Sequence, residues 1–350
     1  MSSRNERFEY RLATPEDDQP ILEIYESGSF SGNISVLFTR RPDPYESLKR
    51  EGENVIIPIM KDKQDNKICA VGCCVIRKAY INGEVKRTGY LTGLKVLPEY
   101  QRRMPHIAHT YDYLYQQTKN QVDVYYTTIL KDNVLAQKML EKRRKGMPIY
   151  QHIGDYTVYC FKTGSRQKSQ GTIFEKGNSN GVKAFYDSQL KNFNFSPVNI
   201  PGLKEQEIFT LRDLDGNVIA ACKIWDQQSY KQYIITGYQG LYKVIKKFPL
   251  RILGYPNLPR ENSPVNYASV TMLCVKDNNK DLAEYFIKEV AQTSEDFDFL
   301  MCGLYENHPL NAVFTKIRHI KYESKVYTVH FNDLNLTLDN RPVNLEVGLL

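Results

Sequence analysis

GYLTGLKVLPEYQRRMPHIAHTYDYLY, residues 89–115, places a strand, a polar turn and a helix in immediate succession. The pattern predicts a strand that ends at Val96, and Ile107, Tyr111 and Leu114 recur along one side of a helix. The turn between them carries two adjacent arginines at residues 102–103. Because the first N–H groups of a helix lack intrahelical partners and carry positive dipole, this turn is typical of a diphosphate-binding site.

The same order of elements recurs in the second half of the chain. In the first half, Leu94-Lys95-Val96 precedes a helix over 106–119, a strand over 124–130 and a helix that begins at Asn133. In the second half, Leu273-Cys274-Val275 precedes a helix over 280–293, a strand over 297–304 and a helix that begins at Asn307. The repetition predicts two copies of one mixed α/β unit in tandem.

The stretch between the two copies is rich in Gly, Ser, Asn and Gln, as linkers are. We therefore expect a first domain over 1–163, a linker over 164–181, a second domain over 182–332 and a tail over 333–350. Within these domains the apolar pattern also predicts a strand over Val55–Met60 and a closing hairpin over Pro148–Phe161. The Tyr- and Lys-rich stretch Tyr238–Lys247 is interpreted as one core face and one solvated face.

Composition narrows the class of protein. Of the 350 residues, 41% are hydrophobic and 25% are charged, as in ordinary globular domains. The net charge of +7 comes without a long basic tail, and it fits an anionic small ligand about as well as a nucleic acid, so it decides little between these partners. No apolar run approaches the roughly 20 residues of a membrane-spanning helix, and the polar start MSSRNERFEY lacks the pattern of a secretory signal. We expect a cytoplasmic protein without a membrane partner.

Cysteine and histidine give no sign of a metal site. The seven Cys include no C-x-x-C pair, which favours reduced, buried thiols. None of the six His forms an H-x-x-x-H or H-E-x-x-H pair. His106 and His109 lie three apart on the expected helix, without a clear third ligand. We expect no metal.

The motifs quoted above resemble those of the GNAT superfamily of acyl-CoA-dependent N-acetyltransferases. That family has a strand ending in V-x-P-x-x, then [Q/R]-x-x-G-x-[G/A], then a helix. This chain reads Val96-Leu97-Pro98-Glu99-Tyr100 and then Gln101-Arg102-Arg103-Met104-Pro105-His106. The opening Arg11 to Asp17 is similar to the start of the family, and Asn133-Val134-Leu135-Ala136 matches its N-x-x-A motif. The resemblance covers about residues 8–161 and, more faintly, 206–331.

The resemblance implies an acyl-CoA N-acyltransferase that moves acetyl from acetyl-CoA, or another acyl group, to a primary amine by direct attack. It implies a small-molecule or peptide amine as the substrate, and a backbone N–H near Val96 that stabilises the oxyanion. The backbone of Leu94, Lys95 and Val96 would pair with the pantetheine arm, and Asn133 would hold the pantetheine or orient the thioester. The CoA pyrophosphate would contact Gln101, Arg102, Arg103, Met104, His106 and Ile107. The sequence carries no signal for the acceptor, the acyl length or the oligomeric state.

The chain departs from the family pattern at informative positions. Met104 and His106 occupy both glycine positions of the loop, with Pro105 between them. The usual general-acid Tyr falls on Leu140, and a frequent Glu base falls on Tyr90, the single catalytic candidate. The corresponding loop of the second copy, Lys276–Asp281, holds acids where a phosphate would lie, so we expect no normal CoA site there.

Other interpretations of the same residues stay open. The two loop arginines suit a solvated turn, Asn133 suits a simple helix cap, and Tyr90 suits a core strand position. Lost glycines and a missing Tyr are what a catalytically inactive GNAT-fold module for ligand sensing or partner binding would have. A nucleic-acid-binding protein is the third hypothesis, and the net charge alone favours it.

Overall fold

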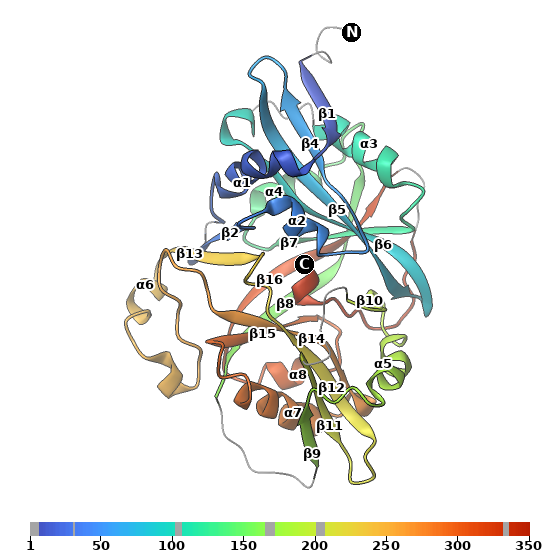
Figure 1. Ribbon diagram of the computed structural model, residues 1–350, viewed down its shortest axis with the longest axis vertical. Coiled ribbons are helices and arrows are strands. Elements are labelled where there is room, and N and C mark those ends of the chain that lie inside the picture. Colours follow the sequence, from blue (N-terminus) through green and yellow to red (C-terminus); the bar gives the residue numbers. More distant parts are fainter. Residues whose placement is uncertain (1–6, 31, 102–106, 165–171, 201–206, 332–335) are drawn as a thin grey trace.

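The computed structural model describes residues 7–30, 32–101, 107–164, 172–200, 207–331 and 336–350. Within these ranges one sheet of 14 strands runs through both halves of the molecule (Figure 1). Its order is β1-β4-β5-β6-β7-β16-β8-β15-β14-β12-β11-β9, and β3 and β10 pair with β5 beside this path. The strands are β1 (Phe8–Leu12), β3 (Asn54–Ile56), β4 (Pro58–Asp62), β5 (Lys67–Ile81), β6 (Glu84–Val96), β7 (Val124–Leu130), β8 (Ile149–Lys162), β9 (Ile173–Lys176), β10 (Ser196–Pro197), β11 (Ile208–Arg212), β12 (Val218–Trp225), β14 (Tyr267–Val275), β15 (Phe299–Tyr305) and β16 (His319–His330).

Helices cover both faces of the sheet in each half. The α-helices are α1 (Asp18–Glu26), α2 (Pro44–Lys49), α3 (Ile107–Thr118), α4 (Val134–Leu140), α5 (Val182–Leu190), α6 (Tyr242–Ile245), α7 (Lys280–Gln292) and α8 (Asn311–Phe314). Tyr90 belongs to the apolar cluster of α1, and its neighbour Leu91 to that of α3. Because successive strand residues point to opposite faces, α1 and α3 lie on opposite sides of the first half. In the second half, α7 and α5 pack in two separate clusters in the same way. None of the described helices is both long and apolar enough to cross a membrane.

The predicted repeat is confirmed by the register of two parallel strand pairs. β6 pairs with β7 from Thr88–Val124 to Tyr90–Tyr126, and β14 pairs with β15 from Tyr267–Phe299 to Ser269–Met301. A bulge follows at the same distance in both copies: the register skips residues 93–94 in β6 and 272–273 in β14. The bulges align Leu94-Lys95-Val96 with Leu273-Cys274-Val275, as the sequence predicted. The fold is therefore a mixed α/β unit present twice.

The two copies exchange their last strands. β16, which follows the second copy in sequence, lies between β7 and β8. β8, which ends the first copy, pairs with β15 of the second. A further two-stranded sheet joins β2 (Ile34–Thr39) of the first half to β13 (Gln232–Tyr238) of the second. The domain boundaries at residues 163 and 182 remain a prediction. Strands that precede and strands that follow these boundaries pair with each other across the two halves.

Two predicted elements were wrong. Pro148–Phe161 is not a hairpin, because residues 149–162 form the single strand β8. Gly154 lies there at φ +151° beside a register shift, so the strand bulges where a turn was expected. Val55–Met60 is not one strand, because β3 and β4 divide it and pair with different parts of β5. The prediction of reduced, buried cysteines is confirmed, since all seven are free and buried.

Candidate functional site

β6 and β7 part to form a V-shaped opening at the centre of the first half. Their parallel pairing covers three residue pairs and ends at Tyr90–Tyr126, although both strands continue, to Val96 and Leu130. β5 on one side and β16 on the other keep their partners paired beyond that point. The facing edges of the two strands therefore separate while their outer edges stay fixed. A strand edge of this kind can pair with an extended ligand.

Hydrogen bonds close the apex of the opening on both faces of the sheet. On the face of α1, the hydroxyls of Tyr90 and Thr128 lie 2.8 Å apart. On the face of α3, the hydroxyl of Thr127 donates to the carbonyl oxygen of Leu91 at 2.6 Å. The neighbouring residues Thr127 and Thr128 thus tie β7 to β6 just past the last backbone pair. The opening begins at a fixed point.

The bulge in β6 lies immediately beyond this apex. Thr92 pairs with Cys73 and Lys95 with Val71, so Gly93 and Leu94 are left out of the register with β5. Gly93 has φ +65°, and a Cβ atom there would lie 2.5 Å from the hydroxyl oxygen of Tyr25. The position therefore requires glycine for both conformation and space.

Tyr90, the catalytic candidate, is deeply buried. Its side chain is 3% exposed, its ring lies 5.0 Å from that of Tyr126, and the guanidinium of Arg77 lies 5.8 Å from its ring centre. Burial raises the pKa of Tyr90 above its ordinary value, against the hydrogen bond with Thr128, which lowers it. The phenol therefore stays protonated at neutral pH. It can donate a hydrogen bond or a proton, and it cannot act as a base there.

The predicted cofactor residues that the structure describes lie along β6 and just beyond it. Leu94 is exposed, Val96 is half-buried, and Ile107 is buried at the start of α3. The side chain of Gln101 donates to the carbonyl oxygen of Val96 at 3.2 Å. Arg102, Arg103, Met104 and His106 lie outside the described residues.

Lys95 holds the end of α1 against the opening. Its ammonium donates to the carbonyl oxygens of Tyr25 at 2.5 Å and Gly28 at 2.8 Å. Burial lowers the pKa of Lys95 from its ordinary value, against the charge of Glu26, which raises it. The side chain of Lys95 thus positions the loop after α1 beside β6. The predicted contact with the cofactor involves the backbone of Lys95 and not this side chain.

Asn133 caps α4 at the open end of the V. Its side-chain oxygen accepts a hydrogen bond from the backbone N–H of Ala136 at 3.1 Å. Asn133 is half-buried, whereas Val134 and Leu135 at the start of α4 are exposed. Asn133 is therefore a helix cap in the structure, and its contact with a cofactor stays a prediction.

The tail of the chain packs against the bulge of the second copy. Met272, with φ +52°, occupies the position of Gly93, and its backbone N–H donates to the carboxyl group of Glu346. The carbonyl oxygen of Leu345 accepts from the hydroxyl of Tyr156 at 3.0 Å, and Trp225 packs against Gly348. Burial raises the pKa of Glu346 to about 7, against the hydrogen bonds with the Met272 backbone and the Asn344 side chain, which lower it. The sequence analysis missed this contact; its one signal was a lone carboxylate inside the apolar run Val343–Leu350.

A buried charge cluster joins the two halves. Glu51, after α2, lies 2.8 Å from the guanidinium of Arg40 and 3.2 Å from the ammonium of Lys231. Arg77 donates to the carbonyl oxygen of Glu51 at 2.6 Å. Lys231 also donates to the carbonyl oxygen of Leu350 at 2.8 Å, so the cluster ties the tail to the first half.

Opposite charges fix the ionisation of this cluster. Burial alone would raise the pKa of Glu51, but the charges of Arg40 and Lys231 lower it to about 2. Burial lowers the pKa of Lys231 to about 8, against the charge of Glu51. The carboxylate is therefore held ionised. Sequence reasoning missed the cluster because its residues lie far apart in the chain.

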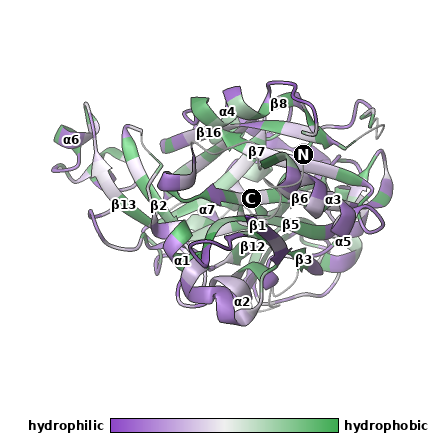
Figure 2. Cartoon of the chain, turned by 90° about the horizontal axis from the view of Figure 1, so that it is seen from above, coloured by the Kyte–Doolittle hydropathy of each residue, from purple (hydrophilic) through white to green (hydrophobic). Residues whose placement is uncertain are grey.

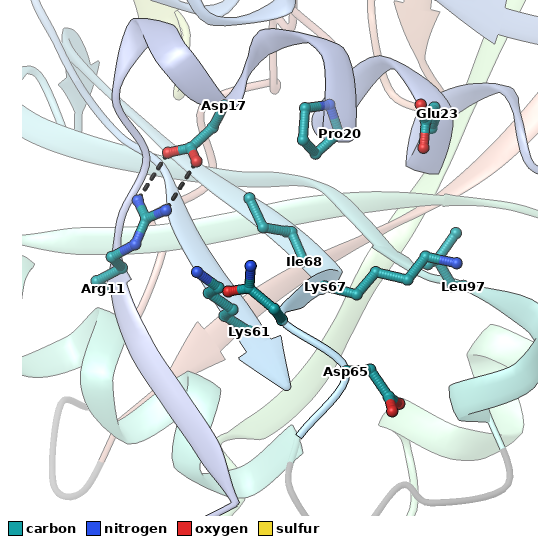
Figure 3. Close-up of a pocket in the computed structure, with 10 residues that line it drawn as sticks. Arg11, Asp17, Pro20, Glu23, Lys61, Asp65, Lys67, Ile68 and Leu97 are labelled. Atoms are coloured by element: carbon teal, nitrogen blue, oxygen red, sulfur yellow. Dashed lines mark hydrogen bonds and ion pairs between the residues drawn. The ribbon is translucent and has the colours of Figure 1, made fainter. Parts of the chain in front are cut away.

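A cavity of about 360 Å³ lies beside the end of β6 (Figure 3). At one side of it Arg11 donates two hydrogen bonds of 2.7 Å to Asp17, and Lys61, Lys67, Glu23 and Asp65 also line it. Its cationic and anionic side chains balance each other. Leu97 reaches this cavity from the strand that forms the opening.

No family model matches the sequence, and no curated protein matches it. Solved structures match its fold over nearly the whole chain. Saccharomyces cerevisiae N-myristoyltransferase with bound myristoyl-CoA superposes with a TM-score of 0.59 at 9% identity, over 99% of this chain and 86% of the other. A GCN5-related N-acetyltransferase from Sphaerobacter thermophilus gives 0.55 at 10% identity, over 97% and 99%. One from Anabaena variabilis gives 0.52 at 12% identity, over 92% and 72%. At these identities the likeness establishes the fold, which is GNAT-like across the whole chain.

Proposed function

We propose that the chain is an acyl-CoA-dependent N-acyltransferase whose first half binds the acyl-CoA in the opening between β6 and β7. The separation of these two parallel strands after Tyr90–Tyr126, followed at once by the Gly93 bulge, carries the proposal. The fold supports it, because it is shared with an N-myristoyltransferase that binds myristoyl-CoA and with GCN5-related N-acetyltransferases.

In this proposal the pantetheine arm lies along the free edge of β6. The backbone of Leu94, Lys95 and Val96 pairs with its amides as an added strand would. The pyrophosphate contacts the loop from Gln101 to Ile107, where Arg102 and Arg103 supply charge. Asn133, at the open end of the V, reaches the pantetheine or the thioester.

The reaction is direct transfer to a primary amine of a small molecule or a peptide. The amine nitrogen gives up a proton to water and attacks the thioester carbon, so that a C–N bond forms and the C–S bond breaks. A backbone N–H near the bulge stabilises the oxyanion. CoA leaves as a thiolate, and the neutral phenol of Tyr90 is our candidate for the group that protonates it.

Titration calorimetry with acetyl-, octanoyl- and myristoyl-CoA tests the binding step. We expect binding by the wild type and at least about a tenfold weaker Kd for Arg102→Ala/Arg103→Ala, since two charge-assisted contacts are lost. Lys276→Ala/Lys280→Ala, in the corresponding loop of the second copy, is the matched control and leaves the Kd unchanged. Absence of binding for all three acyl-CoAs contradicts the proposal, and the preferred chain length among them sets the acyl specificity.

Release of the CoA thiol in the presence of amines and peptides tests the transfer step. Tyr90→Phe should lower kcat and change the Kd for acyl-CoA little: it removes the proton donor and the bond to Thr128, while the ring keeps its packing and the bond from Thr127 to Leu91 still holds the apex. If acyl-CoA binds and no amine or peptide promotes thiol release, the chain is an inactive acyl-CoA-binding module.

A further inference from the structure

A protruding segment between β13 and residue 260 exposes large apolar side chains. It contains α6 and a 3-10 turn over Leu250–Leu253, and it extends to the side of the molecule in two perpendicular views (Figures 1 and 2). The exposed apolar side chains are 56–82% accessible; they are Leu241, Val244, Phe248, Ile252 and Leu253. Five such residues within 13 positions form an apolar surface, whereas single exposed ones are ordinary.

The same segment carries most of the net charge of the chain. Residues 238–260 contain five cations and no acid, against a net charge of +7 for the whole chain. Lys246 pairs with Glu261 at 2.7 Å, whereas Lys243 and Lys247 have no carboxylate partner among the described residues. Both of these lysines are exposed. Cations are thus interleaved with the apolar side chains.

Polar contacts hold the base of the segment firmly. Tyr238 is buried and its hydroxyl donates to the carbonyl oxygen of Pro259 at 2.6 Å. Arg251 donates to the carbonyl oxygens of Thr163 at 2.9 Å and Asp298 at 3.1 Å. The aromatic residues of Tyr238–Lys247 thus face the core as expected, but Leu241 and Val244 do not. The apolar surface is presented on a fixed support.

We propose that this segment, residues 241–253, docks the protein on a membrane surface that contains anionic lipids. Exposed apolar side chains gain by entering the headgroup boundary, and the surrounding lysines gain by approaching lipid phosphates. A second copy of the chain would bring the four cations of residues 241–253 against the same four of its partner, which disfavours self-association through this surface. The expectation of no membrane partner rested on the absence of a membrane-spanning run, and a segment that binds at the membrane surface does not need such a run.

Docking here would bring the opening between β6 and β7 close to the lipid. The backbone N–H of Gln239, at the root of the segment, donates to the carbonyl oxygen of Asn33 at 2.8 Å. The same loop after α1 is held to β6 by the bond from Lys95 to Gly28 at 2.8 Å. Leu94 on β6 and Leu135 on α4, the helix that follows β7, are themselves exposed. A continuous set of contacts therefore links the segment to the opening.

Co-sedimentation of the full chain with vesicles tests this proposal. We expect the wild type to bind phosphatidylcholine vesicles that contain phosphatidylserine, and to bind pure phosphatidylcholine more weakly. Phe248→Ser/Ile252→Ser should lower the partition coefficient at least about tenfold, because two apolar side chains that would enter the lipid are lost. Lys243→Gln/Lys247→Gln should lower it about tenfold and reduce its dependence on salt.

Leu214→Ser is the matched control, because Leu214 is 80% exposed in the turn between β11 and β12, away from the segment. It should leave vesicle binding unchanged, and all variants should keep the circular dichroism spectrum of the wild type. Failure of the wild type to bind either vesicle overturns the proposal, as does an equal loss in Leu214→Ser. The proposal is also overturned if the chain does not bind vesicles and instead uses Phe248 and Ile252 for self-association or for binding nucleic acid. Acyl-CoA affinity without vesicles is a separate readout that these variants should leave intact.

Discussion

The two copies of the fold contain the same bulge and use it differently. In the first copy, Gly93 lies beside Tyr25, and among the described residues no strand pairs with the inner edge of β6 beyond Tyr90. In the second copy, Met272 has the same left-handed backbone, and Glu346 of the tail accepts from its N–H. The bulge is therefore a property of the fold. What lies against it distinguishes a candidate ligand site from a structural contact.

The charge cluster that ties the tail to the first half should give the largest effect. Glu51→Ala leaves Arg40 and Lys231 buried without their carboxylate, so we expect a loss of about 3–5 kcal/mol in the free energy of unfolding at pH 7. Urea denaturation measures it. Glu53→Ala, which removes an exposed partner 3.9 Å from Lys78, is the control and should have little effect. Equal effects of the two changes would show that the cluster does not join the halves.

Removing the charge of Glu346 should stabilise the second copy at high pH. The pKa of this carboxyl is raised to about 7 in the folded chain, so its contribution to stability is present below its unfolded pKa and is lost as pH rises through 7. We expect Glu346→Gln to match the wild type near pH 5 and to exceed it by about 2–3 kcal/mol at pH 8. Urea denaturation across this range checks the difference. A difference that does not change with pH would contradict burial of an ionisable Glu346.

Replacing the glycine at the first bulge with alanine should destabilise the chain more than the same replacement at a glycine with open space around it. Gly93→Ala combines left-handed backbone with a contact of 2.5 Å to Tyr25, and we expect a cost of about 2–3 kcal/mol. Gly177→Ala, at φ +82° with no atom within 4 Å, isolates the backbone strain at about 1 kcal/mol. Thermal and urea unfolding compare the two. Equal costs would mean that Tyr25 moves aside and that the bulge is less tightly built than described.

The smallest expected effects come from the residues that cap a helix in each copy. Asn133 caps α4 at 3.1 Å and Asn279 caps α7 at 3.0 Å. Each change to Ala should cost about 1 kcal/mol in unfolding free energy. Asn133→Ala should in addition weaken acyl-CoA binding several-fold by calorimetry, and Asn279→Ala should not. If neither change alters the Kd, Asn133 is a cap alone.

Local patterns predicted the strands and helices well. The strand over 124–130 and the strand that ends at Val96 were predicted as observed, because apolar runs bounded by turn residues define buried strands. The repeat followed from the order of these elements, and the expectation of a GNAT-like fold came from the resemblance of the motifs at residues 96–106 and 133–136. The hairpin predicted over Pro148–Phe161 was wrong, and Gly154 in its middle lies in a bulge, a position that glycine suits as well as a turn.

The parts that sequence reasoning missed depend on contacts between distant residues. Nothing local to Glu51 indicates that Arg40 and Lys231 will surround it, and Glu346 meets Met272 only after the tail has crossed both halves. Leu241 and Val244 have the spacing of a buried face, and their exposure follows from where α6 lies. The roles assigned to Tyr90 and Asn133 stay predictions until the binding and transfer steps are measured.

The interleaved strands also set the timing of folding during synthesis. β7 and β8 leave the ribosome well before the strand between them, β16, which follows the second copy in sequence. Until then, the nascent first half presents two unpaired strand edges, which favour pairing with other chains. The first half must therefore wait for β16 before its sheet can close. We expect slow, chaperone-dependent maturation for a chain whose individual elements form locally.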